Sequence, residues 1–416
     1  MVFLSAAAFK KRVTADDSKL TAKDRADLQQ TLESLRAMGM VQGKVDLFAK
    51  QNQLAAATYL AFYDDTKKEI VIPGTSLDVE ERVTLAHELT HTLDDEHFNL
   101  AKVNKIGDQH DTDAVTALVE GDAVSVENQF VAKLSAADRA AYDRSQQAGV
   151  TQADLRGVPK VFELLQQWPY DFGPIFVGIL QKLGGQARVN AAFRSPPIDE
   201  EQVIDPIAYY NADLPAPIAA PVLPPGAKKL DSAKEFGALA WYLVLSERID
   251  AHVALKAALG WGSDTYTVAR EGKQTCMEIR YRGETRQDNT EMLDALHRWI
   301  AALPRGMASV KSNNDHTMTL HSCDPGTAAK VVTDRSIDAY QLLLFRDQII
   351  EDVMKSGAPL PAATCIGDAV TDRTTVADIM AGKTPPVLAT VNAMVQIGLD
   401  CRNAPPSALT QDKIDN

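Results

Sequence analysis

The segment His87-Glu88-Leu89-Thr90-His91 constrains this chain more than any other stretch of its sequence. Residues four apart lie on one face of an α-helix, so a helix here lets His87 and His91 direct both imidazoles at one metal ion. Glu88 follows His87 directly, which brings a carboxylate beside the ion, where it can take a proton from a water molecule. The chain has 8 His among 416 residues, so a chance match to these three positions is expected in roughly one per cent of such chains. The segment therefore predicts a helix that carries a metal site.

The flanking residues favour this helix. Leu85, Leu89 and Leu93 add an apolar stripe at helical spacing. Acidic residues stand where a helix start prefers negative charge, at Asp78, Glu80 and Glu81. We therefore expect a helix over about residues 77–95. The motif that it carries, H-E-x-x-H, is typical of zinc-dependent peptidases.

Two strands are expected just before this helix. Residues 58–63 and 69–72 are rich in aromatic and β-branched side chains, and they enclose a polar turn at residues 64–67. A strand pair that runs into the metal helix would supply an edge on which a peptide substrate is held by main-chain hydrogen bonds.

His97 is one candidate for the third metal ligand. Catalytic zinc usually has three protein ligands and keeps a fourth position for water. His97 lies six residues after His91, which is the spacing of the metzincin motif H-E-x-x-H-x-x-G-x-x-H. Asp94 stands where that motif has the Gly that allows a sharp turn. Met277, inside an apparent strand, makes no convincing Met-turn. These departures weaken the metzincin interpretation but leave it open.

Glu120 is the other candidate. Residues 111–132 have the pattern of one long helix, on which Asp113, Glu120 and Glu127 recur every seven residues on roughly one face. A second helix that delivers a glutamate to the two His residues is the gluzincin design. Because 28 residues separate His91 from Glu120, we expect an extra loop at residues 99–110.

The first half of the chain resembles a group of bacterial and archaeal zinc-peptidase-like proteins of gluzincin type, mostly uncharacterised and often exported. The resemblance covers roughly residues 35–210 and rests on the order of five blocks: residues 63–71, 87–98, 117–123, 169–177 and 196–209. It implies a zincin-like fold in which Glu120 is the third ligand.

Two later residues matter in this comparison. Asp205 stands where the family pattern leads us to expect a His before Pro206, which changes the local charge. Tyr170 is the residue of the later blocks that we assign to chemistry, because a phenol near zinc can donate a hydrogen bond to the oxyanion of a tetrahedral intermediate. A core tyrosine beside Phe172 and Phe176 is the alternative.

Composition and net charge limit the classes of protein to which this chain can belong. With 45% hydrophobic and 24% charged residues, the chain is globular, and its 416 residues suffice for two or three domains. A net charge of −13 argues against a nucleic-acid or anionic-membrane surface, and no apolar run is long enough to span a bilayer. Residues 1–9 are apolar but precede the basic residues 10–12, the reverse of a signal peptide. The protein is therefore cytoplasmic, or its numbering begins after a removed signal.

A proline-rich stretch at residues 213–229 has the composition of a semi-rigid linker. We expect a zincin-like metallopeptidase domain at residues 1–212, an α+β accessory domain at 230–330 and a helical segment at 331–416. The fold class is α+β and mostly helical. Further helices are expected at 23–38, 158–183, much of 231–259 and 290–303. A turn is expected at 260–264, and strands are expected near 266–269, 276–281, 308–311 and 318–322.

All 4 cysteines follow the linker: Cys276, Cys323, Cys365 and Cys401. Adjacent pairing is the simplest of three connectivities, and neither pair has C-x-x-C metal spacing; buried free thiols are the alternative. The last 80 or so residues resemble the disulfide-closed helical segments of exported actinobacterial proteins. This resemblance favours an extracytoplasmic or secreted protein.

The sequence thus predicts a zinc-dependent peptidase that acts on a peptide or protein substrate. His87, His91 and Glu120 would bind Zn²⁺, Glu88 would act as general base and Tyr170 would assist. One of Asp94, Asp113 or Asp122 would orient a ligating imidazole. The rival hypothesis is a non-catalytic binding or scaffold protein on a peptidase-like fold, with a structural or occluded zinc that His97 closes as a fourth ligand. Substrate specificity and oligomeric state are not predicted.

Overall fold

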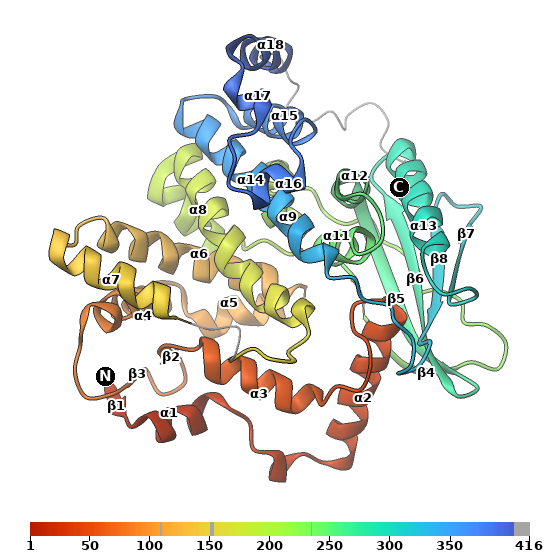
Figure 1. Ribbon diagram of the computed structural model, residues 1–416, viewed down its shortest axis with the longest axis horizontal. Coiled ribbons are helices and arrows are strands. Elements are labelled where there is room, and N and C mark those ends of the chain that lie inside the picture. The colour runs from red at the N-terminus through yellow and green to blue at the C-terminus, as the bar shows by residue number, and fades with distance from the viewer. Residues whose placement is uncertain (109, 150–153, 234, 403–416) are drawn as a thin grey trace. The chain divides into compact units, whose positions relative to one another are not determined.

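The structure is a computed structural model that describes residues 1–108, 110–149, 154–233 and 235–402 (Figure 1). The protein is α+β and mostly helical, which confirms the predicted class. The chain divides into two compact units: one comprises Met1–Arg25 and Asp46–Asp199, and the other comprises Ala26–Val45 and the chain from Glu200 onward. None of the described helices is long and apolar enough to cross a membrane.

The first unit combines a small sheet with a set of helices. The sheet has the order β1-β3-β2, with β1 parallel and β2 antiparallel to the central strand. The elements of this unit are β1 (Val2–Leu4), α1 (Ala6–Val13), a 3-10 turn (Asp17–Lys19), α3 (Leu47–Thr58), β2 (Phe62–Asp64), β3 (Glu69–Pro73), α4 (Val79–Phe98), α5 (Leu100–Gly107), α6 (Thr112–Val131), α7 (Ala136–Ala148) and α8 (Lys160–Arg194).

Helix α4 carries the H-E-x-x-H motif, and its ends follow from local chemistry. Asp78 accepts hydrogen bonds from the backbone N–H groups of Glu80 and Glu81, and Glu81 accepts one from the backbone of Asp78, which forms a capping box. At the other end Asn99 adopts the left-handed conformation that stops a helix. The expected leucine stripe is not the buried face, since Leu89 and Leu93 are exposed. The buried face instead holds the polar residues of the motif.

Two other expectations in this unit are wrong. A loop was expected at residues 99–110, but Leu100–Gly107 form helix α5. Asn99 caps this helix by accepting a hydrogen bond from the backbone N–H of Lys102, and the buried Leu100 and Val103 anchor it. The strand expected from residue 58 begins only at Phe62, because helix α3 continues to Thr58.

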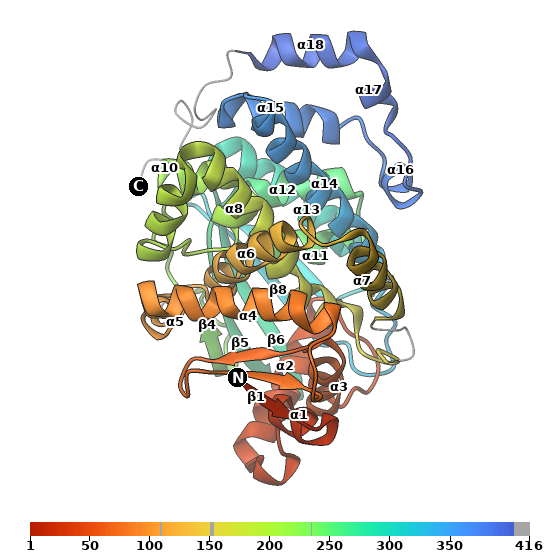
Figure 2. The same cartoon turned by 90° about the vertical axis from the view of Figure 1, so that its left-hand side faces the viewer.

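Helix α6 packs between α4 and α8, and Figure 2 shows the three helices following one another away from the small sheet. The crossing of α6 and α8 is very close at two glycines. A Cβ atom on Gly121 would lie 2.3 Å from the carbonyl oxygen of Gly173, and one on Gly173 would lie 2.2 Å from that of Ala117. Only glycine lets these two backbones meet.

The second unit contains an antiparallel sheet of order β4-β5-β6-β8-β7 with helices (Figure 1). Its elements are α2 (Ala22–Ala37, in this unit from residue 26), α9 (Glu201–Ile204), α10 (Pro206–Asn211), β4 (Lys228–Ala233), α11 (Ala238–Ser246), α12 (Ala251–Leu259), β5 (Trp261–Glu271), β6 (Gln274–Gly283), α13 (Arg286–Ala301), β7 (Ala308–Ser312), β8 (Met318–Cys323), α14 (Arg335–Lys355), α15 (Leu360–Thr371), α16 (Val376–Met380), α17 (Pro386–Ala389) and α18 (Val391–Cys401).

The four strands predicted here and the helix after β6 are confirmed, but the turn at residues 260–264 is wrong. Strand β5 begins at Trp261, with a bulge that ends at Ser263. The indole N–H groups of Trp241 and Trp261 both donate to the buried carboxylate of Asp264, which draws this segment into the core. The helical expectation for residues 231–259 holds only in part, since they include the end of β4 as well as α11 and α12.

Both predicted disulfides are present. Cys276 pairs with Cys323, directly opposite it on β6 and β8, and Cys365 of α15 pairs with Cys401 at the end of α18. The adjacent connectivity is therefore confirmed, and no free cysteine remains.

Candidate metal centre

Helices α4 and α6 bring three possible metal ligands together. The Nε2 atoms of His87 and His91 lie 3.0 Å apart, and Oε2 of Glu120 lies 3.1 Å from the first and 3.4 Å from the second. Both histidines are buried, and the three residues form one group of possible metal ligands. Two imidazole nitrogens and a carboxylate oxygen are a donor set that suits zinc.

The electrostatics of this group favour a bound cation. The Nδ1 atom of His87 lies 3.2 Å from Oε2 of Glu127, so an N–H at Nδ1 donates to that carboxylate. When the imidazole is neutral, the other nitrogen, Nε2, then carries a lone pair. That lone pair faces Glu120 and the second imidazole, and three electron-rich atoms so close together repel one another unless a proton or a metal ion lies among them.

The pKa values of two of these residues also indicate that the group favours a nearby positive charge. Burial opposes the charged form of His87, but Glu120 and Glu127 outweigh burial and raise the pKa of this imidazole to about 10. Burial likewise opposes the charged form of Glu120, while hydrogen bonds from His87 and His91 lower the pKa of this carboxyl to about 2. The site therefore holds a carboxylate together with positive charge.

Glu127 is the carboxylate that orients His87, a role that was not predicted from the sequence. It lies seven residues after Glu120 on the same helix, a spacing that marks a shared face. The hydroxyl of Tyr142, on α7, donates to its other oxygen at 3.3 Å. A carboxylate behind a metal-ligating histidine fixes the orientation of the ring.

Glu88 lies beside the group on α4, with only 5% of its surface exposed. Its Oε2 atom has no hydrogen-bond partner among the described residues. Burial raises the pKa of this carboxyl, although a backbone hydrogen bond from Tyr63 and the two histidines oppose that shift. A buried carboxylate with a free oxygen is poised to accept a proton.

Tyr170, on α8, reaches the same group. Its ring stacks near that of His87, with centroids 6.4 Å apart, and its hydroxyl donates a hydrogen bond to Glu120. Burial and the Glu120 carboxylate raise the pKa of this phenol, so it remains a hydrogen-bond donor. The close contact of Gly121 with Gly173 is what lets α8 approach Glu120.

Two cavities flank these residues. One, of about 410 Å³, extends toward α7 and is also lined by Val124 and Tyr142. The other, of about 440 Å³, extends along β2 and is also lined by Arg12, Phe62 and Tyr63. Five residues line both cavities: Tyr59, Ala61, His87, Glu88 and Tyr170. The candidate centre is therefore open on two sides.

The strand pair β2–β3 is tied to helix α4. The hydroxyl of Tyr63 donates to Asp95 at 2.6 Å, Lys68 makes an ion pair with the same carboxylate, and Asp95 also caps the backbone N–H of Leu100. One buried carboxylate on α4 thus binds β2, the turn before β3 and the start of α5.

The rival ligand, His97, lies outside the group. It is exposed near the end of α4, and its Nδ1–H donates to the carbonyl of Leu93 at 2.8 Å. The helix continues past Asp94, so the sharp turn of the metzincin motif does not form.

The three aspartates that were predicted as candidates to orient an imidazole lie in two different environments. Asp113 is exposed in the first turn of α6. Asp94 and Asp122 are buried near each other, and burial followed by this neighbour raises the pKa of Asp94 to about 8. Nδ1 of His91 has no hydrogen-bond partner within the described ranges.

Asp205 belongs to the second unit. Its carboxylate lies 3.6 Å from the guanidinium of the fully buried Arg346, which also pairs with Asp347 and Asp368. The negative charge at this position therefore has a structural partner.

Comparison of the chain with protein-family models, with curated proteins and with solved structures gave no match. The family resemblance seen in the sequence therefore stays a prediction.

Proposed function

We propose that the protein is a zinc-dependent peptidase of gluzincin type. The observation that carries this proposal is the convergence of His87, His91 and Glu120 beside the buried Glu88, whose Oε2 atom has no hydrogen-bond partner among the described residues. Zinc held by the three ligands would supply Lewis acidity, which polarises a carbonyl group and makes water more acidic.

Within this proposal, the protein's own residues manage the protons and the charge. Glu88 takes the proton of the attacking water and passes it to the leaving amine. The raised pKa of Glu88 makes it a better proton acceptor than an exposed glutamate. Tyr170 donates a hydrogen bond to the oxyanion that develops on the substrate, and Glu127 keeps His87 oriented.

The substrate we propose is an extended peptide segment. Strand β2 is the edge strand of its sheet, and Phe62 and Tyr63 on it line the second cavity. An extended peptide can pair with such an edge through main-chain hydrogen bonds. The two cavities then receive side chains on either side of the bond that is cut.

We further propose that the protein works outside the cytoplasm. Its two disulfides support this location, because disulfides persist in oxidising compartments and are rare in the cytosol.

The scaffold hypothesis has less support. It requires a closed zinc site with His97 as fourth ligand, whereas His97 is exposed and bonded to its own helix. The cavities on both sides of Glu88 also favour access by a substrate.

The test combines metal analysis with a substrate screen. We expect one zinc per chain at the centre and cleavage within a library of internally quenched peptides. Glu88→Gln should retain that zinc and lose turnover by at least about 10²-fold. Glu96→Gln, an exposed position on the same helix, should behave like the wild type. Full activity of Glu88→Gln would refute the general base, and zinc binding with no cleavage of any peptide would favour the scaffold.

A further inference from the structure

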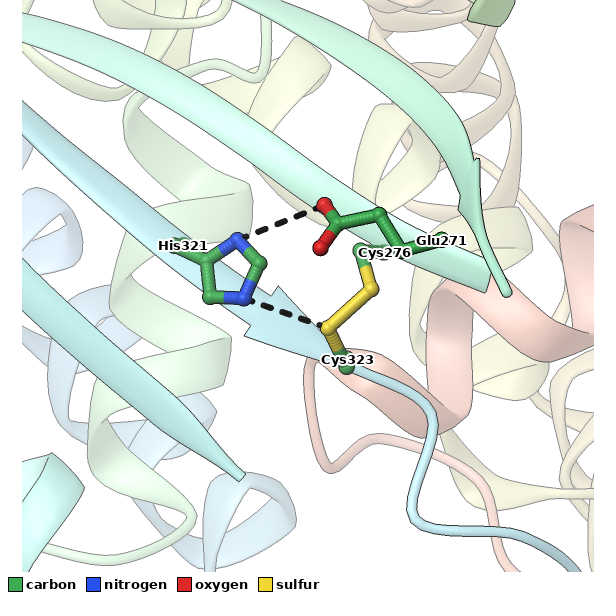
Figure 3. Close-up of side chains that lie close together, drawn as sticks. All are labelled: Glu271, Cys276, His321 and Cys323. Atoms are coloured by element: carbon green, nitrogen blue, oxygen red, sulfur yellow. Dashed lines mark hydrogen bonds and ion pairs between the residues drawn. A yellow bond between two sulfur atoms is a disulfide. The ribbon is translucent and has the colours of Figure 1, made fainter. Parts of the chain in front are cut away.

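A second group of metal-ligating side chains lies in the five-stranded sheet. It consists of Glu271 at the end of β5, Cys276 on β6, and His321 and Cys323 on β8 (Figure 3). One possible ligand atom from each residue lies within 4.8 Å of all the others. The two cysteines are joined as a disulfide, so their sulfurs are not thiolates in this form.

The register of the sheet brings these side chains together. Cys276 is paired with Cys323, and Glu278 is paired with His321, two residues further along the same strands. Side chains two apart on a strand point to the same face, so all four share one face of the sheet. Nδ1 of His321 bonds Oε1 of Glu278 at 2.5 Å, while Nε2 lies 3.3 Å from Sγ of Cys323.

This arrangement resembles a zinc site with its ligands in place and its sulfurs oxidised. A ligating histidine usually donates its other N–H to a carboxylate, which is the role that Glu278 fills for His321. Glu271 has a buried carboxylate oxygen that accepts no hydrogen bond from the described residues, and one of its oxygens lies within 4.8 Å of a ligand atom of each of the other three residues. Two thiolates, one imidazole and one carboxylate would complete a four-ligand set.

The group is reachable from a cavity. A space of about 550 Å³ is lined by Glu271, Glu278 and His321 on the sheet and by residues 222–225 of the proline-rich stretch. Cys276 is fully buried and Cys323 is partly exposed. Cys323 is therefore the more accessible of the two cysteines.

We propose that reduction of the Cys276–Cys323 disulfide creates a Zn²⁺ site made of Cys276, Cys323, His321 and Glu271. A thiolate of a dithiol reductant attacks Sγ of Cys323, and the S–S bond breaks with release of the Cys276 thiolate. The second thiol of the reductant then displaces Cys323, so two electrons pass to the protein and the reductant becomes a disulfide. Zn²⁺ binds both thiolates and releases any protons they carry.

The second disulfide is an internal control. Cys365 and Cys401 lie in an apolar cluster with Val370 and Ile397. They belong to no group of three or more possible metal ligands in the described part of the chain. Reduction there frees two thiols without a histidine and a glutamate to complete a site.

The test is a Co²⁺ titration of the full chain before and after reduction by a phosphine, which does not compete for the metal as a thiol would. We expect the reduced protein to bind one additional Co²⁺ with thiolate-to-cobalt charge-transfer absorption in the near ultraviolet. A centre made of His87, His91 and Glu120 has no sulfur and gives no such band, so the outcome is independent of the proposed peptidase activity. Zn²⁺ should displace the Co²⁺ and abolish the band.

Matched variants decide between the two disulfides. The band should vanish in Cys276→Ser/Cys323→Ser and persist in Cys365→Ser/Cys401→Ser. His321→Ala keeps both disulfides and should weaken Co²⁺ binding at least tenfold, which provides a test even if the first double variant does not fold. The proposal is overturned if the reduced protein gains no ion, if the oxidised protein binds the additional ion equally well, or if the band depends on Cys365 and Cys401.

Discussion

Replacing Gly121 by alanine probes the contact that brings α8 to the metal centre. The new Cβ would lie 2.3 Å from the carbonyl oxygen of Gly173 and 2.4 Å from its carbonyl carbon. Favourable contacts of this kind lie near 3.5 Å, so the two helices must separate by roughly 1 Å. Both neighbours are backbone atoms, which cannot turn aside as a side chain can.

The magnitude follows from two opposing effects. Overpacking of this kind costs about 1–3 kcal/mol, while Gly→Ala inside a helix contributes up to about 1 kcal/mol of stability. We therefore expect Gly121→Ala to lower the free energy of unfolding by about 1–2 kcal/mol, or Tm by about 2–8 °C. Because Glu120 precedes this residue and Tyr170 lies one turn from Gly173, zinc affinity should fall as well.

Gly398→Ala is the matched control. This glycine also lies inside a helix, α18, and a Cβ there would have no neighbour within 4 Å. Thermal unfolding followed by circular dichroism should show Gly398→Ala at or above the wild-type Tm and Gly121→Ala below it. A Gly121→Ala protein as stable as the control, with unchanged zinc affinity, would refute the close-contact argument.

Three further predictions test charge and hydrogen bonding. Asp324→Ala should lower the free energy of unfolding, measured with urea, by about 3–5 kcal/mol. The substitution leaves the buried guanidinium of Arg36 without the carboxylate whose oxygens lie 2.7–3.1 Å from its nitrogens. An unchanged unfolding transition would contradict this. Glu127→Ala should weaken zinc binding about 10–100-fold in competition with a chelator, since it frees the ring of His87. Burial raises the pKa of Asp94 to about 8 from 3.8, so its contribution to stability is present below pH 3.8 and is lost as pH rises through 8. Metal-free Asp94→Asn should therefore match the wild type near pH 4 and exceed it by several kcal/mol near pH 9; parallel pH profiles would refute the shift.

Much of the candidate centre could be anticipated because its elements are set by short-range patterns. The spacing of His87 and His91 requires one helix face, and Asp78 with Glu81 encodes the start of that helix. The periodic pattern of α6 put Glu120 on a second helix, and the pairing of neighbouring cysteines in the sequence agrees with the disulfides formed.

The incorrect predictions concern residues whose burial depends on contacts with distant segments of the chain. Leu89 and Leu93 have helical spacing with the motif, but helix packing left them exposed and buried the polar face instead. A loop was expected after α4 because of the long gap between His91 and Glu120, but Leu100 and Val103 are buried in the core and Leu100–Gly107 form α5. Hydrophobic patterning reveals that a residue can be buried but not which neighbours will bury it.

Spacing along the chain was enough to predict the helix that carries His87 and His91, its capped start and the mostly helical class. It favoured adjacent pairing of the cysteines but left the other connectivities open. Tertiary structure alone decided that Glu127 lies behind His87, that two cavities flank Glu88, and that His321 lies against the Cys276–Cys323 bridge. Glu127 is 40 positions from His87, Cys276 is 47 positions from Cys323, and each cavity is lined by several separate segments. Their geometry therefore follows from how helices and strands pack rather than from any local repeat.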